Sequence, residues 1–124
     1  MKITRQKDSL QIEKPEGTKV SYYLFPEYEI HYNEQLPHTT QMWHHHETVW
    51  ETLMVLEGQL TAHWREDGKE KETILQAGDM VENERTPHTF SNDTDKVVKF
   101  IVFKQVLSGK DKKEILKADK VLDQ

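Results

Sequence analysis

The chain has 124 residues, a length that suits one domain with one hydrophobic core. Its formal net charge of -5 argues against a nucleic-acid partner, because binding to phosphates requires a basic surface. The absence of cysteine excludes a disulfide, a thiolate metal ligand and a cysteine nucleophile, so a metal site would need nitrogen and oxygen ligands.

Neither a secretory signal nor a membrane span is expected. Residues 1–10 mix charged and polar side chains and lack the apolar run of a signal peptide. No apolar run elsewhere approaches the ~18 residues that a membrane-spanning helix needs. We therefore expect a cytoplasmic protein with no membrane partner.

Most of the chain is predicted to form short strands, because β-branched and aromatic residues are dense and turn residues recur every ~8–12 positions. The expected strands cover residues 19–25, 28–33, 52–56, 60–65, 70–75, 86–92 and 97–103. Asp67-Gly68 is the strongest turn signal and predicts a hairpin, while Gly58 can supply the positive φ of an earlier tight turn or bulge. This pattern is typical of an all-β barrel or sandwich.

The barrel prediction accounts for residues 1–107, and the composition then shifts to lysine and aspartate. Apolar residues in this last part recur at helical spacing: Ile115, Leu116, Val121 and Leu122. Asp111 and Glu114 form a capping box. We therefore expect a short C-terminal helix within residues 108–124, belonging to the same domain, which either lies across the barrel or contacts a partner.

Histidine is frequent, with seven residues, three of them consecutive. In a strand, side chains at i and i+2 share a face about 6.5–7 Å apart, so His44 and His46 can bind one ion while His45 points away. Glu51 would face the opposite side of a straight strand. We therefore expect a turn at residues 47–50, after which a second strand beginning at Glu51 returns the carboxylate to both imidazoles. The alternative for the histidine pair is a solvated polar strand.

Another histidine, His88, lies 37 residues after Glu51, and Pro87 before it suits the entrance of a strand. Leu53 and Val55 are expected to share the inward face of Glu51. Two further histidines lie in expected strands, His31 and His63, of which His63 is expected to face outward. His38 is expected in a loop, with a proton carrier at the barrel mouth as the alternative.

Two spaced motifs carry these candidates. The first comprises His44, His46, Glu51 and Gly58. The second comprises Gly78, Asp79, His88 and Asn92. Their spacing resembles the two conserved motifs of the cupin superfamily, and the chain is similar to its small, single-domain members.

The resemblance implies a double-stranded β-helix, the jelly-roll barrel of cupins. It implies that one divalent metal ion is held by four ligands, carried over onto His44, His46, Glu51 and His88. It also implies frequent homodimers. A metal-free barrel is the alternative.

The motifs depart from the family pattern at two places. His38 stands where the family's first motif opens with glycine, six residues before its first histidine. In the second motif Glu84, Arg85 and Thr86 occupy a region that usually holds proline and glycine, and the stretch before His88 is one residue shorter. The closing part of the motif, from His88 to Asn92, keeps the family spacing.

Three neutral imidazoles and one carboxylate would leave a divalent ion with one net positive charge and, in octahedral geometry, two open positions. Such a site suits Fe, Mn, Ni or Zn and exchangeable oxygen ligands. The resemblance implies an enzyme acting on a small organic substrate, either a dioxygenase or an isomerase. The alternative is a non-catalytic module that binds or senses a small molecule. A metal-free sugar-nucleotide epimerase comes last, because no basic nucleotide groove is evident.

Overall fold

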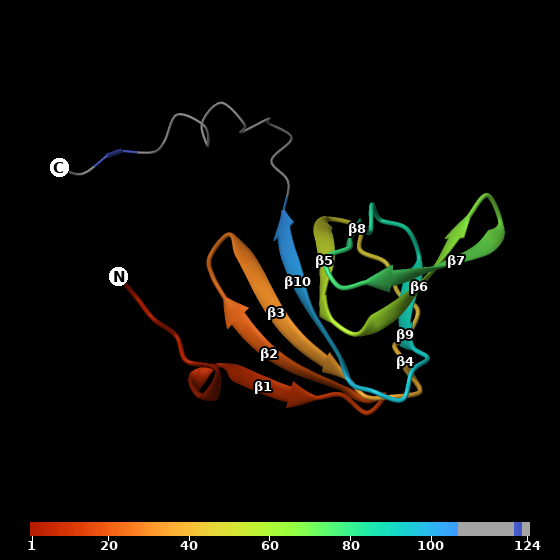
Figure 1. The fold of residues 1–124 in the computed structure, drawn as a ribbon. Helices are drawn as coiled ribbons and strands as arrows, with labels where there is room; N and C mark the ends of the chain where they lie inside the picture. Colours follow the sequence, from red (N-terminus) through yellow and green to blue (C-terminus); the bar gives the residue numbers. More distant parts are fainter. Residues whose placement is uncertain (107–120, 123–124) are drawn as a thin grey trace.

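The computed structural model describes residues 1–106 and 121–122. The strands within residues 1–106 form two facing antiparallel sheets (Figure 1). In order across the first sheet, the strands are β1 (Leu10–Glu13), β2 (Thr18–Leu24), β3 (Tyr28–Gln35), β10 (Val98–Val106), β5 (Val49–Glu57) and β8 (Met80–Glu82). The second sheet contains β4 (Thr39–Thr40), β9 (His88–Asn92), β6 (Gln59–Glu66) and β7 (Lys69–Gln76). A single 3-10 turn, η1 (Gln6–Asp8), precedes β1 within this part of the chain.

The core lies between the two sheets and is built by alternation along the central strands. Side chains buried in it come from both sheets: Leu53, Val55, Leu60, Ala62, Leu75, Phe90, Val98, Phe100 and Val102. β10 pairs with β5 so that Val102 lies opposite Leu53 and Phe100 opposite Val55. The prediction that Leu53 and Val55 share the inward face of Glu51 is confirmed, because all three are buried on alternate positions of β5.

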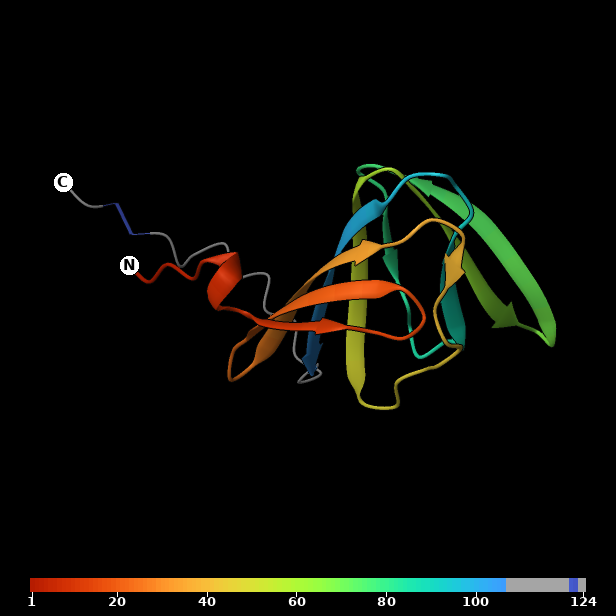
Figure 2. The ribbon, with the colours of Figure 1, turned by 90° about the horizontal axis from the view of Figure 1, so that it is seen from below.

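All seven expected strands are present, with bounds shifted by a few residues, which confirms the all-β prediction. Three strands were not predicted, namely β1, β4 and β8. They are only two to four residues long and lie at or near sheet edges, so their sequences carry no readable alternation. Figure 2 shows the hairpins β2–β3 and β6–β7 extending from opposite sides of the molecule.

Gly58 forms the turn between β5 and β6 with φ of 89°. A Cβ atom at this position would lie 3.3 Å from the Cα atom of Val98, so both the backbone angle and the space favour glycine. Asp67 and Gly68 also have positive φ, 52° and 70°, at the tip of the hairpin β6–β7. Both turn predictions are confirmed.

The C-terminal helix expected within residues 108–124 lies mostly outside the described residues. Val121 and Leu122, the two residues of this range that are described, are not helical. Within the described part of the chain, no helix has the length and apolar character that crossing a membrane requires.

Candidate metal centre

His44 and His88 are brought together by the backbone. Each accepts a hydrogen bond from the other's amide, from His44 N to His88 O at 3.0 Å and from His88 N to His44 O at 2.9 Å. Their ring centroids lie 4.5 Å apart. The expectation that His44 and His46 share one regular strand is wrong, because only His44 pairs, in this isolated bridge, between β4 and β5. The chain then bends at residues 47–48 and enters β5.

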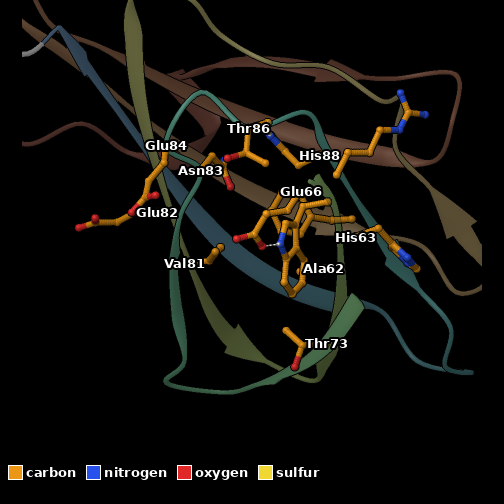
Figure 3. A pocket seen from close by; sticks show the side chains of 13 residues that line it. Ala62, His63, Glu66, Thr73, Val81, Glu82, Asn83, Glu84, Thr86 and His88 are labelled. Carbon is orange, nitrogen blue, oxygen red and sulfur yellow. Dashed lines mark hydrogen bonds between the residues drawn. The ribbon is translucent and has the colours of Figure 1, made fainter. Parts of the chain in front are cut away.

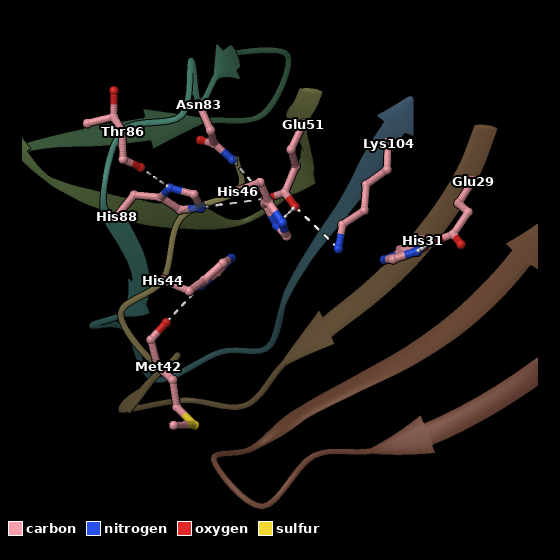
Figure 4. A network of polar contacts seen from close by, with 10 residues as sticks. All are labelled: Glu29, His31, Met42, His44, His46, Glu51, Asn83, Thr86, His88 and Lys104. Atoms are coloured by element: carbon pink, nitrogen blue, oxygen red, sulfur yellow. Dashed lines mark hydrogen bonds and ion pairs between the residues drawn. The ribbon is translucent and has the colours of Figure 1, made fainter. Parts of the chain in front are cut away.

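Glu51 is the buried centre of the cluster (Figure 4). Its Oε1 accepts a hydrogen bond from Asn83 Nδ2 at 2.8 Å, and its Oε2 accepts one from His46 Nε2 at 3.0 Å. Lys104 Nζ lies 3.4 Å from Oε2. Burial alone would raise the pKa of Glu51, but the nearby positive charge of Lys104 opposes burial, and the pKa of this carboxyl is lowered from its ordinary value. The carboxylate is therefore ionised at neutral pH.

Two backbone carbonyls fix the orientation of His44 and His88. His44 Nδ1 donates to Met42 O at 2.9 Å, and His88 Nδ1 donates to Thr86 O at 2.6 Å. A proton on Nδ1 leaves Nε2 of each neutral ring with a free lone pair. Burial lowers the pKa of His44, which favours this neutral form.

A metal ion fits this arrangement because one fully buried acceptor, His88 Nε2, has no hydrogen-bond partner among the described residues. It faces Glu51 Oε1 at 3.6 Å, too far for a hydrogen bond. A buried nitrogen lone pair beside a carboxylate is costly without a partner, and a divalent cation would satisfy both.

The spacing of the donor atoms agrees with that fit. Ligand atoms of His44, His46 and Glu51 all lie within 4.8 Å of one another. Atoms bound to one ion at about 2.0–2.2 Å are separated by about 3–4 Å, so the cluster needs only small side-chain shifts. His88 adjoins this group through its contact with Glu51.

The histidines that were expected outside the metal site also lie outside the cluster in the structure. His45 is bound to Glu47 and half-exposed, and His38 sits in a loop with φ of 56°, bound to Asp95. His63 is on the outer face of the second sheet, but it is mostly buried there, 2.8 Å from Ser91 Oγ.

Sequence reasoning missed three residues around the centre: His31, Asn83 and Lys104. Lys104 continues the inward alternation of Phe100 and Val102 along β10, so a charged residue in an apolar register was the available signal. The predicted strand ended at residue 103, one position too early to reveal it. Asn83 follows a short strand that sequence reasoning did not predict, so it carried no comparable signal.

The loop before His88 contains no glycine, unlike the family pattern. Glu84 and Arg85 both adopt left-handed backbone angles, with φ of 49° and 62°. Arg85 Nε donates to Glu47 O at 2.8 Å, and this bond ties the loop to the segment that carries His46.

Three cavities border the cluster. One of about 320 Å³ lies beside His88 and Asn83, with walls from β6 and β7 and from the loop after β8 (Figure 3). A second, of about 310 Å³, is lined by His46 and Lys104 together with Phe25 and other residues. A third, of about 50 Å³, lies inside the barrel and is lined by His44, Glu51 and Lys104 among others.

The cluster opens towards the cavity beside His46. The His46 side chain is 26% exposed, whereas Glu51 is 6% and His88 4% exposed.

Fold and cluster together define a cupin. Residues 30–104 match the model of the cupin domain family, more than half of the chain, so the chain belongs to this family. The chain of 124 residues therefore forms a small cupin domain, as its motifs predicted.

Solved structures share this fold at low sequence identity. The Drosophila melanogaster CENP-C domain bound to CAL1 has a TM-score of 0.73 at 20% identity, over 83% of this chain and 85% of that one. A predicted oxalate decarboxylase from Thermotoga maritima has a TM-score of 0.73 at 16% identity, over 86% of this chain and 100% of that one. The Fe(II) form of HppE has a TM-score of 0.68 at 18% identity, over 84% and 60%. A search of curated proteins gave no match.

Proposed function

We propose that the chain binds one divalent metal ion through His44, His46, Glu51 and His88 and acts on a small organic substrate, as a dioxygenase or an isomerase. The observation that carries this proposal is the buried Nε2 of His88. Its lone pair faces Glu51, the ring is held by Thr86 O, and no described residue satisfies it.

Different residues of the chain would bind the ion, orient its ligands and exclude water from the site. A bound ion would supply Lewis acidity and positions for exchangeable ligands. Glu51 stays ionised and offsets part of the ion's charge, while Asn83 fixes the carboxylate by the hydrogen bond to Oε1. Leu53 and Phe90 are buried beside the cluster and exclude water from its inner side. A substrate would enter on the side of His46, which is more exposed than Glu51 and His88.

Three nitrogen donors and one carboxylate oxygen suit Fe, Mn, Ni or Zn, as expected from the sequence. The solved structure of the Fe(II) form of HppE supports iron as one member of this set, since that protein shares the fold. The cytoplasmic location expected from the sequence stays a prediction.

Metal analysis of the purified protein tests the site. We expect about one ion per chain in the wild type and at least ~10-fold weaker binding in His46→Ala. His45→Ala is the matched control, because His45 is adjacent in sequence but contacts Glu47. Metal content unaffected by His46→Ala would contradict the proposal.

Reaction type follows from two assays of the metal-loaded protein. Oxygen consumption with catechols, diketones and thiols would identify a dioxygenase. Interconversion of sugars or keto compounds without oxygen uptake would identify an isomerase.

A ligand that raises the melting temperature and is recovered unchanged would instead favour the second candidate, a non-catalytic module that binds or senses a small molecule.

We further propose that two copies associate as a homodimer through the outer face of the first sheet. Apolar side chains on this face are at least partly exposed and are neighbours across β3, β10, β5 and β8: Ile30, Met54, Met80, Ile101 and Phe103. A self-complementary apolar face is what a two-fold interface requires. Phe103→Glu should convert a dimer to a monomer in analytical ultracentrifugation, and a monomeric wild type would contradict the proposal.

A further inference from the structure

Lys104 stands beside the candidate metal centre although a cation there opposes the binding of another cation. We infer that Lys104 makes this site selective for a negatively charged substrate, a small organic carboxylate. This inference rests on the proposed metal site and adds the class of substrate that the site would accept.

The fold holds Lys104 inside the barrel. It follows Phe100 and Val102 on the inward face of β10, and it lies opposite Glu51 on β5 and Glu29 on β3. Its side chain is only 25% exposed, and Figure 4 shows it between Glu51 and the pair formed by His31 and Glu29. The ammonium group is therefore a partly buried charge beside Glu51.

Lys104 is poorly satisfied by its protein contacts. An ammonium group has three donors, yet among the described residues its only ion pair is with Glu51 Oε2, at 3.4 Å. The same oxygen accepts a shorter bond from His46. Glu29, the next carboxylate, is bound to His31 Nε2 at 2.8 Å. Spare donors near the centre are what binding of a carboxylate would use.

Charge balance favours the same class of ligand. A divalent ion and Glu51 together leave one positive charge, and Lys104 adds a second, while the imidazoles contribute none when neutral. In the lining of the inner cavity, Lys14 adds a further positive charge, whereas Glu27 and Glu29 line only the outer cavity beside His46, where Glu29 is bound to His31. The excess positive charge therefore lies at the inner cavity. A partly buried site with excess positive charge favours an anion over a neutral molecule of equal shape.

The cavities place Lys104 on the path of a ligand. It lines the cavity of about 310 Å³ beside His46 and also the inner cavity of about 50 Å³ beside His44. The inner cavity is small, since one water needs about 10–15 Å³, so it suits a group of a few atoms such as a carboxylate. Thr18 also lines it, and its buried hydroxyl has no hydrogen-bond partner among the described residues.

A purely structural role for Lys104 explains these facts less well. Glu51 is already held by Asn83 and His46, and an ammonium beside it weakens metal binding by repulsion. Neutralising Lys104 should therefore leave metal content intact while weakening the preference for anions.

The test compares two ligands of nearly equal shape on cobalt(II)-loaded protein. Pyruvate carries a carboxylate where 2,3-butanedione carries a neutral acetyl group. Binding is followed by the visible cobalt spectrum and by calorimetry. We expect the wild type to bind pyruvate at least ~10-fold more tightly, and Lys104→Met to show a clearly smaller preference at unchanged cobalt content, because the ion and Glu51 still leave one positive charge.

Two further variants keep the result interpretable. Lys99→Met is the matched control on the same strand, because Lys99 faces outward and pairs with Glu57, and it should behave as the wild type. Lys104→Arg keeps the charge and should keep the preference, which guards against a folding defect in the methionine variant.

Cobalt-loaded wild type that binds pyruvate no better than 2,3-butanedione would overturn the inference, as would an unchanged preference in Lys104→Met. A wild type that takes up no cobalt would instead overturn the proposed metal site, and cobalt analysis before the titration distinguishes the two failures.

Discussion

At the scale of single residues, Asn83 shows how the site depends on side chains that do not touch the metal position. It is buried, and its amide donates to the Glu51 oxygen that faces His88. Asn83→Ala would remove the hydrogen bond to Oε1 and leave the carboxylate held through Oε2 alone. Second-layer partners of this kind typically change metal affinity by about 10–100-fold.

We therefore expect Asn83→Ala to bind metal at least ~10-fold more weakly than the wild type in a competition titration with a chelator. Glu82→Gln is the control, because Glu82 is an exposed neighbour. Equal affinity of Asn83→Ala and wild type would show that the packing around Glu51 suffices to orient it.

His31 makes stability depend on pH. Burial lowers the pKa of His31 below its ordinary value of 6.5, despite the bond to Glu29. The unfolded chain then binds a proton more readily than the folded one, so stability is lost as pH falls below that value. His31→Gln removes this proton and keeps a polar group beside Glu29.

Chemical unfolding of chelator-treated protein at pH 7 and pH 5 measures this effect. His31→Gln should lose less stability between the two pH values than the wild type does. His44 has a pKa shifted in the same direction by burial, so part of the pH dependence should remain. His38→Gln serves as control, since His38 is exposed in a loop. A variant as pH-dependent as the wild type would exclude His31 as a source.

Residue types and spacing pointed to His44, His46 and Glu51 as candidate ligands, and the resemblance to cupins carried the set over onto His88 as well. Residue types and spacing were insufficient for His31, Asn83 and Lys104. A lysine or asparagine is ordinary anywhere in a sequence, and only the strand register reveals that Lys104 points inward beside Glu51.

At the scale of elements, alternation predicted the long strands well, because one face of each is buried against the other sheet. It could not predict the segment around His44, which pairs through a single bridge and bends twice before β5. The hydrogen bonds that position His44 come from His88, 44 residues later in the chain, and no local pattern encodes that contact.

The turn at Gly58 gives a test at this scale. Gly58→Ala would place a side chain on a left-handed backbone and 3.3 Å from Val98 Cα. We expect a loss of about 1–3 kcal/mol in the free energy of unfolding. Gly68→Ala is the matched control: its φ is also positive, at 70°, but nothing lies within 4 Å of the added atom.

Urea unfolding of both variants separates the two contributions. The control should lose about 1 kcal/mol, from the backbone angle alone. If Gly58→Ala were no less stable than Gly68→Ala, the close approach of Val98 would carry no energetic weight.

At the scale of the whole molecule, the candidate site links the two sheets. Glu51 belongs to the six-stranded sheet and His88 to the four-stranded one, while His44 and His46 lie in the segment between them. An ion held by all four would therefore add a link between the two sheets to those already made by hydrogen bonds such as that from Asn92 to Gln35. Metal binding should stabilise the entire fold rather than one loop.

The size of this effect follows from mass action. A ligand present at 100 times its dissociation constant stabilises the folded state by about 2.7 kcal/mol. We therefore expect the melting temperature of the wild type to rise with added Mn(II) and to fall when a chelator is present, while His45→Ala behaves in the same way. His46→Ala should respond much less, because its affinity for the ion is lower. If the melting temperatures of wild type and His46→Ala moved together over the whole range of Mn(II), the ion would be binding elsewhere on the protein.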